Sequence, residues 1–431
     1  MSANSAELPA GIHTIVLGAG DTNGIMRGKR IPASHWPTAC EKGVALSIAT
    51  LAIDMTCDVW DTPYANFDNG YPDMHLFPAG PVHAMPWEEG VGFCFGRFEG
   101  MDHKPVPIDP RNSLVRVLER AEAMGYEVNI GAELEFYLLD PETLQPRDRG
   151  IQVYGLARAA ELEHVLGPIR RHLNDVGIPI EQSNPEYAAG QVEVNIRYGE
   201  ALASADRAVS FRSLVKELAV SQNYLATFMS KPFAEESGNG FHCHHSLWKK
   251  GKNAFAKGGK LSALGLNYLA GMQSRMCEMS LASATTPNAY RRRQPYTFCP
   301  INTAWSVDNR TVGIRVIEGN DTAVRIEKRD GSADCNPYYL LACEIAAGLE
   351  GIEQGLEPSK ATPGNAYESA DDEPIPTDLA TAVELAKNSD FMSQVLGPDS
   401  LGILVGQAER ELEFFANQVT SVEMDRYLLN M

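Results

Sequence analysis

The sequence has few features that would tie it to a nucleic acid, a membrane or an oxidising compartment. Its 37 lysines and arginines are outnumbered by 56 aspartates and glutamates, and the net charge of −19 argues against a polyanion as the main partner. Its eight cysteines form no Cys-x-x-Cys pair, so neither a zinc ribbon nor a disulfide framework is indicated. No apolar run approaches the length of a membrane span, and residues 1–11 lack a signal-peptide pattern. We therefore expect a cytoplasmic protein that binds neither nucleic acid nor membrane.

The chain is long enough for a large core and for more than one domain. It has 431 residues, of which 44% are hydrophobic and 22% charged, as in ordinary globular proteins. The proline-rich stretch Pro105-Val-Pro-Ile-Asp-Pro110 predicts a domain boundary, because residues 113–124 then show helical spacing that ends near Gly125. We expect a small N-terminal domain over residues 1–109 and a large domain over residues 110–431.

The remaining pattern predicts alternating helices and strands. Residues 13–17 indicate a strand, and the following glycines have the spacing G-x-G-x-x-x-G, which favours a β-turn into a second strand over a dinucleotide-binding loop. Residues 55–90 are rich in Pro, Gly, Asp and Trp and predict an irregular surface segment. Helical spacing covers residues 156–175, 200–229, 263–283, 337–355 and 401–429, whereas residues 357–375 predict an exposed loop.

Four segments, far apart in the chain, place polar or charged side chains at every second position. In residues 191–197, Gln191, Glu193 and Asn195 share one face of a predicted strand, and apolar residues take the other. One such strand would most simply be half solvated in an antiparallel sheet. Four together are better explained by one sheet whose polar face lines a cavity. The other three segments present Glu133 and Glu135; His242, His244 and Ser246; and Arg325, Glu327 and Arg329.

The acids among these residues need a countercharge. Five carboxylates cannot crowd together as anions without one. Oxygen ligands with one or two imidazoles and no thiolate cluster indicate Mg²⁺ or Mn²⁺ rather than a structural zinc. The five are Glu133, Glu135, Glu186, Glu193 and Glu327.

Six blocks in this order resemble the glutamine synthetase family, and the resemblance covers roughly residues 10–430. Single pieces such as His-x-His are weak, but the ordered set is specific. Residues 21–29 and 71–78 also fit. The blocks are Gly131-Ala-Glu-Leu-Glu-Phe136; Glu186-Tyr-Ala-Ala-Gly-Gln-Val-Glu193; Lys231-Pro232 with Gly238-Asn-Gly-Phe-His-Cys-His-His-Ser-Leu247; Asn288-Ala-Tyr-Arg-Arg292; Asp308-Asn-Arg310 with Ile314-Arg315; and Arg325-Ile-Glu-Lys-Arg329 with Asn336-Pro337.

The resemblance implies a role for each matching residue. In this family ATP phosphorylates the γ-carboxylate of L-glutamate, and a nitrogen nucleophile then attacks the γ-glutamyl phosphate. Cations and arginines stabilise the charge that develops on the phosphoryl group. The implied residues are Glu135, Glu186 and Glu193 for one metal; Glu133, His242 and Glu327 for a second; Glu181, Tyr198, His244, Ser246 and Arg325 for ATP; Gly238, Arg292 and Arg329 for glutamate; and Arg310 and Arg315 for the phosphoryl group.

The acceptor half of the site departs from the ammonia-using members of the family. Those members carry an Asp-Gly-Ser-Ser segment and a flap glutamate, where this chain has Cys57-Asp-Val-Trp-Asp61 and Phe298. We expect a primary amine larger than ammonia, with its apolar body against Phe298, Trp60 and Tyr154, while Asp58 or Asp61 accepts its proton. The alternatives are a glutamine synthetase that uses ammonia and a catalytically silent structural or regulatory homologue, although a silent chain should have lost ligands that this one retains.

The resemblance also implies the architecture. We expect an α+β protein with a small N-terminal β-grasp-like domain and a large catalytic domain built on a curved antiparallel sheet flanked by helices. The implied assembly is a dodecamer of two hexameric rings, with Asp58 completing the site of an adjoining subunit. Tyr367 lies where some bacterial relatives carry an adenylylated tyrosine, but its flanking residues differ from theirs and we do not expect modification.

Overall fold

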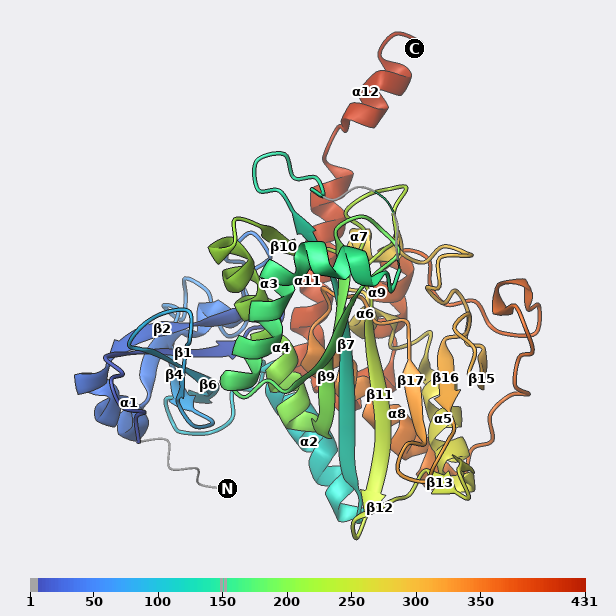
Figure 1. Ribbon diagram of the computed structural model, residues 1–431, viewed down its shortest axis with the longest axis horizontal. Coiled ribbons are helices and arrows are strands. Elements are labelled where there is room, and N and C mark those ends of the chain that lie inside the picture. Colours follow the sequence, from blue (N-terminus) through green and yellow to red (C-terminus); the bar gives the residue numbers. More distant parts are fainter. Residues whose placement is uncertain (1–6, 148–149, 151–152) are drawn as a thin grey trace.

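The computed structural model describes residues 7–147, 150 and 153–431. Its N-terminal part is a six-stranded sheet in the order β2-β1-β6-β4-β3, with β5 paired to β6. In Figure 1 this part is blue and lies at the left. Its elements are β1 (Thr14–Gly20), β2 (Met26–Pro32), η1 (Ala33–His35), α1 (Trp36–Lys42), β3 (Val44–Ser47), η2 (Ile48–Leu51), β4 (Asp73–Pro78), β5 (His83–Ala84) and β6 (Val91–Gly100).

The turn between β1 and β2 confirms that the early glycines do not form a dinucleotide loop. The two strands pair antiparallel. The buried carboxylate of Asp21 accepts the backbone N–H groups of Asn23 and Ile25 and so closes the turn. No helix begins here, so this turn lacks the phosphate-binding N-terminus of a nucleotide fold.

The expectation that residues 55–90 are irregular is wrong in its second half. Strand β4 pairs with β3 and β6, and β5 pairs with β6. Met74 and Leu76 of β4 are buried in the N-terminal core beside Leu17 and Trp36. The alternation extends over too few residues to be recognised locally, and the strand is defined by partners distant in the sequence.

The large sheet has nine strands and confirms that the four charged segments belong together. Its order is β15-β16-β17-β11-β7-β9-β8, with β10 paired to β7 and β12 to β11. All pairs are antiparallel except β15–β16. The strands are β7 (Glu127–Leu139), β8 (Ile180–Pro185), β9 (Gln191–Glu200), β10 (Leu225–Thr227), β11 (Phe241–Lys249), β12 (Lys252–Asn253), β15 (Trp305–Val307), β16 (Ile314–Ile317) and β17 (Arg325–Lys328); β13 (Ala256–Lys257) and β14 (Lys260–Leu261) form a separate hairpin.

Helices cover the apolar face of this sheet (Figure 1). Helix α4 packs on β7 and β9, α2 on β7, and α3 beside β8, whereas α8 is buried among α2, α4 and α5. Among the described residues no helix is both long and apolar enough to cross a membrane. The helices are α2 (Pro110–Ala123), α3 (Leu156–Asp175), α4 (Ala201–Ser221), α5 (Ala263–Arg275), α6 (Ser280–Ser283), α7 (Pro287–Tyr290), α8 (Pro337–Gln354), η3 (Ala366–Glu368), α9 (Leu379–Lys387), α10 (Asp390–Leu396), α11 (Pro398–Ala416) and α12 (Ser421–Tyr427).

Three of the predicted helices are too long. Helix α4 ends at Ser221, because Asn223 adopts a left-handed conformation before β10. The stretch 263–283 is interrupted between α5 and α6. The stretch 401–429 divides into α11 and α12, which begins with a capping box between Thr420 and Glu423. Apolar spacing continues across each break, so periodicity alone did not locate them.

Candidate active site

The register of the large sheet brings the predicted metal ligands together. His242 on β11 lies opposite Glu133 on β7, and His244 lies opposite Glu327 on β17. Glu135 on β7 lies opposite Glu193 on β9. Because side chains alternate along a strand, these residues all project from the same face of the sheet.

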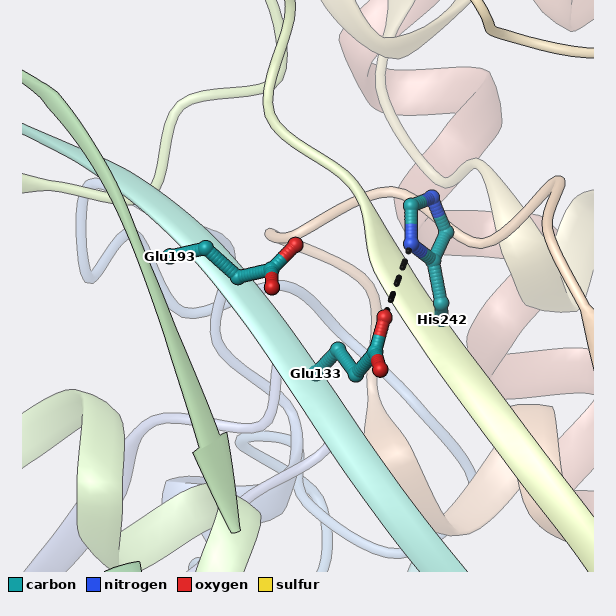
Figure 2. A group of neighbouring side chains, drawn as sticks. All are labelled: Glu133, Glu193 and His242. Carbon is teal, nitrogen blue, oxygen red and sulfur yellow. Dashed lines mark ion pairs between the residues drawn. The ribbon is translucent and has the colours of Figure 1, made fainter. Parts of the chain in front are cut away.

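Glu133 stands at the centre of this group. Figure 2 shows Glu133, Glu193 and His242 pointing toward one another from β7, β9 and β11. An oxygen of Glu133 lies 3.5 Å from Nδ1 of His242, and its other oxygen lies 2.8 Å from Nε2 of His244. Potential ligand atoms lie within 4.8 Å of one another in two sets: Glu133, Glu193 and His242, and Glu133, His244 and Glu327.

These sets combine the predicted residues differently from the two predicted triads. Glu135 and Glu186 are the outer members. Glu135 accepts the backbone N–H of Gly240 at 2.6 Å, and Glu186 accepts the side-chain amide of Asn184 at 2.9 Å. Both line the same pocket as His242, so they lie at the edge of the cluster. The assignment of ligands to two separate ions stays a prediction.

The electrostatic environment differs between the two sides of the cluster. Burial and the nearby carboxylates of Glu133 and Glu135 raise the pKa of Glu193 to about 9. Burial and the charge of Glu135 raise the pKa of Glu186 to about 7. Crowded carboxylates with raised pKa values lack a countercharge, and a hard divalent cation among oxygen and imidazole donors would supply it. The residues present therefore fit Mg²⁺ or Mn²⁺.

On the other side of the cluster, arginine side chains already pair with Glu327. Although burial opposes it, Arg329 holds the pKa of Glu327 at about 2. A guanidinium nitrogen of Arg315 donates to Glu327 at 3.0 Å, and a second one donates to Asp308 at 2.6 Å. Arg310, the other predicted phosphoryl-binding residue, is exposed on the connection between β15 and β16. Arg315 and Arg329 thus approach the cluster through Glu327.

A pocket of about 360 Å³ opens beside Glu133 and contains every predicted ATP-binding residue. Within it, Nε of Arg325 donates to Nδ1 of His244 at 3.1 Å. The indole N–H of Trp248 donates to the hydroxyl of Ser246 at 3.0 Å. The sequence interpretation missed Trp248, which continues the alternation of His244 and Ser246 on β11. The predicted residues that line this pocket are Glu181, Tyr198, His244, Ser246 and Arg325.

A smaller pocket of about 50 Å³ lies on the opposite side of the cluster and contains the predicted glutamate-binding residues. Gly238, Arg292 and Arg329 line it together with Phe298. A Cβ atom at Gly238 would lie only 2.7 Å from the carbonyl oxygen of Ser230, so a larger residue would displace the backbone here. Because Glu133 lines the large pocket and His242 the small one, the cluster stands between the two.

Aromatic side chains line the small pocket and its surroundings. The rings of Tyr187 and Phe298 both line it, with centroids 5.7 Å apart, and the two side chains are 44% and 43% exposed. Tyr187 was not singled out from the sequence, although it directly follows Glu186. Tyr154 is also exposed, and burial together with the charges of Glu186 and Glu193 raises its pKa, so its phenol lies near the cluster.

Two other predicted acceptor residues lie elsewhere. Asp58 is exposed, and its backbone N–H donates to the carboxylate of Asp54. The ring of Trp60 packs on Gly406 of α11, where an added Cβ would lie 2.4 Å from it. Neither lines the two pockets of its own chain. Their proposed contribution to a neighbouring subunit stays a prediction.

Comparisons with known proteins identify the family. Residues 107–427 match the family model described as glutamine synthetase, catalytic domain. The chain belongs to the glutamine synthetase family. This membership confirms the resemblance that the ordered motifs indicated, and it confirms the expected α+β fold.

Members of the family that are similar over nearly the whole chain include enzymes named for amines other than ammonia. Glutamate–isopropylamine ligase of a Pseudomonas species is 33% identical over 437 residues, which cover 97% of this chain and 95% of that protein. Gamma-glutamylethanolamide synthetase GlnA4 of Streptomyces coelicolor is 35% identical over 430 residues, which cover 96% and 92%. A solved structure of GmaS without ligand superposes with a TM-score of 0.87 at 28% identity and covers 98% of this chain and 97% of that one.

Proposed function

We propose that this protein is an ATP-dependent ligase that joins the γ-carboxylate of L-glutamate to a primary amine larger than ammonia. The observation that carries the proposal is the aromatic pair Tyr187 and Phe298 in the small pocket. Ammonium binding depends on charge and hydrogen bonds, which Phe298 does not supply. Hydrocarbon surface buried against these rings would contribute about 25 cal/mol for each Å². The named activities of the two similar amine ligases support the same direction.

The two pockets suit the two halves of the reaction. ATP would occupy the large pocket, and glutamate the small one, where Arg292 and Arg329 would bind its carboxylate groups. Bound Mg²⁺ or Mn²⁺ would neutralise charge on the transferring phosphoryl group. The predicted ligand sets are Glu135, Glu186 and Glu193 for one ion and Glu133, His242 and Glu327 for the other.

Only the free amine can attack the acyl phosphate, so the acceptor site needs a group that removes a proton. Phe298 cannot do so. We propose that Asp58 of an adjoining subunit does, in the dodecamer of two hexameric rings that the family resemblance implies. Exposed apolar residues near Asp58 support the proposal that another subunit covers this loop. Val59 is 49% and Phe67 is 87% exposed in the single chain. The cytoplasm remains our expected compartment.

A screen of amines tests the proposal. Phosphate release would be measured with saturating glutamate, ATP and Mg²⁺ against ammonium, alkylamines, ethanolamine, polyamines and aniline, and each product would be identified by mass. We expect some larger amine to exceed ammonium in kcat/KM by at least about tenfold, or roughly 1.4 kcal/mol. An enzyme that uses ammonium best would be a glutamine synthetase. If phosphate were released equally well in the absence of any nucleophile, both the amine ligase and the glutamine synthetase assignments would be contradicted.

A further inference from the structure

We propose that Tyr367 is a positioning residue that holds the acceptor loop, residues 294–299, over the glutamate pocket and thereby sets the affinity for the nucleophile. The proposal deepens the proposed function and rests on it. Three features of the structure carry it: the backbone conformation of the acceptor loop, the contacts of Tyr367, and the hydrogen bonds that join η3 to the segment 302–311.

The acceptor loop has a backbone conformation that needs support. Tyr296 has a φ of 62° and Phe298 a φ of 59°, in the left-handed region that residues other than glycine seldom occupy. Two such residues within three positions persist only when their surroundings hold them. On the pocket side of the loop, a guanidinium nitrogen of Arg329 donates to the carbonyl oxygen of Phe298 at 3.5 Å. This hydrogen bond is long, and it is made to Phe298 rather than to Tyr296.

Tyr367 supplies a second support from η3. Its ring lies 5.3 Å from the ring of Tyr296, between centroids. Its hydroxyl is buried and faces the backbone N–H of Phe298. The hydroxyl of Tyr296 in turn donates to Glu368 at 3.2 Å. The ring of Tyr367 therefore makes the contact with Tyr296, and its hydroxyl, being buried, is poorly placed for modification.

The short helix η3 and the residue before its cap are hydrogen-bonded to the segment 302–311. The side-chain amide of Asn302 donates to the carbonyl of Ala366 at 2.7 Å, and the N–H of Ala366 donates to the hydroxyl of Thr311 at 3.0 Å. Asn309 donates to the carbonyl of Gly364 at 2.6 Å. Asn309 and Thr311 flank Arg310 in the sequence. Residues 364–367 therefore contact both the acceptor loop and the segment that carries Arg310.

The test compares Tyr367→Ala with Tyr367→Phe, using the best nucleophile found in the amine screen. Loss of the ring should release the loop, so Tyr367→Ala should raise the KM for the nucleophile at least about tenfold while the KM for ATP changes less than about twofold. Tyr367→Phe retains the ring and should stay within about twofold of the wild type in both constants. The control is Tyr126→Ala, which removes a half-buried tyrosine next to Lys249 that lines neither pocket.

Hydrogen exchange of residues 294–300 in the enzyme without substrates gives a readout that does not depend on activity. Exchange should be faster in Tyr367→Ala than in the wild type, Tyr367→Phe and Tyr126→Ala. Unchanged exchange, or faster exchange with an unchanged KM for the nucleophile, would overturn the proposal. If the wild type uses only ammonium, the proposed function fails, and the same comparison with ammonium still decides the role of Tyr367.

Discussion

A charge introduced at position 298 should change the preference of this site between a larger amine and ammonium. Phe298 already has a left-handed backbone, so replacing it with another non-glycine residue adds no backbone strain of its own. Phe298→Glu would place an anion beside Tyr187 and remove an apolar ring from the pocket. We expect the ratio of kcat/KM for the amine to kcat/KM for ammonium to fall at least about tenfold. Phe298→Leu keeps the surface apolar and should preserve the preference; equal ratios in both variants would exclude a role for charge at this position.

Glu135 and Glu327 are both predicted metal ligands, but their surroundings differ. Replacing each by glutamine should therefore distinguish an effect on catalysis from an effect on stability. Glu327 is 1% exposed and pairs with Arg315 and Arg329, so Glu327→Gln leaves these two guanidinium groups without a full countercharge. Glu135 accepts one backbone N–H, which Glu135→Gln can still satisfy. Both variants should lose phosphate release by more than about a hundredfold, and Glu327→Gln alone should also lower the melting temperature markedly.

The response of the melting temperature to Mg²⁺ checks the same assignment without turnover. A ligand that binds only the folded chain raises the melting temperature. The wild type should therefore melt higher with Mg²⁺, and each variant should show a smaller rise. Near-wild-type turnover in either variant, or an unchanged rise with Mg²⁺, would show that the residue is not a ligand.

At the scale of elements, the start of α2 carries a testable electrostatic cost. Asp109 caps α2 by accepting the N–H of Arg111, yet burial raises its pKa to about 7 from an ordinary 3.8. A carboxyl whose pKa is raised by folding contributes stability at low pH and loses it as the pH rises through about 7. Asp109→Asn keeps the cap acceptor without the charge. It should melt a few degrees above the wild type at pH 8 and no higher at pH 4.

A second capping aspartate serves as the control for this experiment. Asp378 is the exposed N-cap of α9 and accepts the N–H of Thr381. Its charge favours the helix N-terminus at the surface, so Asp378→Asn should not raise the melting temperature at pH 8. An Asp109→Asn variant that melts below the wild type at pH 8 would mean that the ionised carboxylate stabilises the fold despite its burial.

Strands β7, β9, β11 and β17 could be predicted because alternation along one strand is a local signal. Their register could not, and it is the register that sets His242 opposite Glu133 and Glu135 opposite Glu193. Strand β4 was missed because its pairing is non-local. Tyr187 was missed for a related reason: its partner Phe298 lies more than a hundred positions away in the chain.

At the scale of the whole molecule, the single chain leaves Asp58 exposed and outside the linings of the ATP and glutamate pockets. If Asp58 serves a neighbour, co-expressed Asp58→Ala and Arg329→Ala subunits should form some sites with both residues intact. Random mixing makes about a quarter of sites complete, because each site needs Arg329 from one subunit and Asp58 from the next. We therefore expect hybrids to recover up to about a quarter of wild-type activity while each parent is inactive.

Co-expressed Arg292→Ala and Arg329→Ala subunits should recover none, since both residues line the same pocket of one chain. Hybrids confirmed by mass that stay inactive in the first mixture would place the complete site within a single subunit.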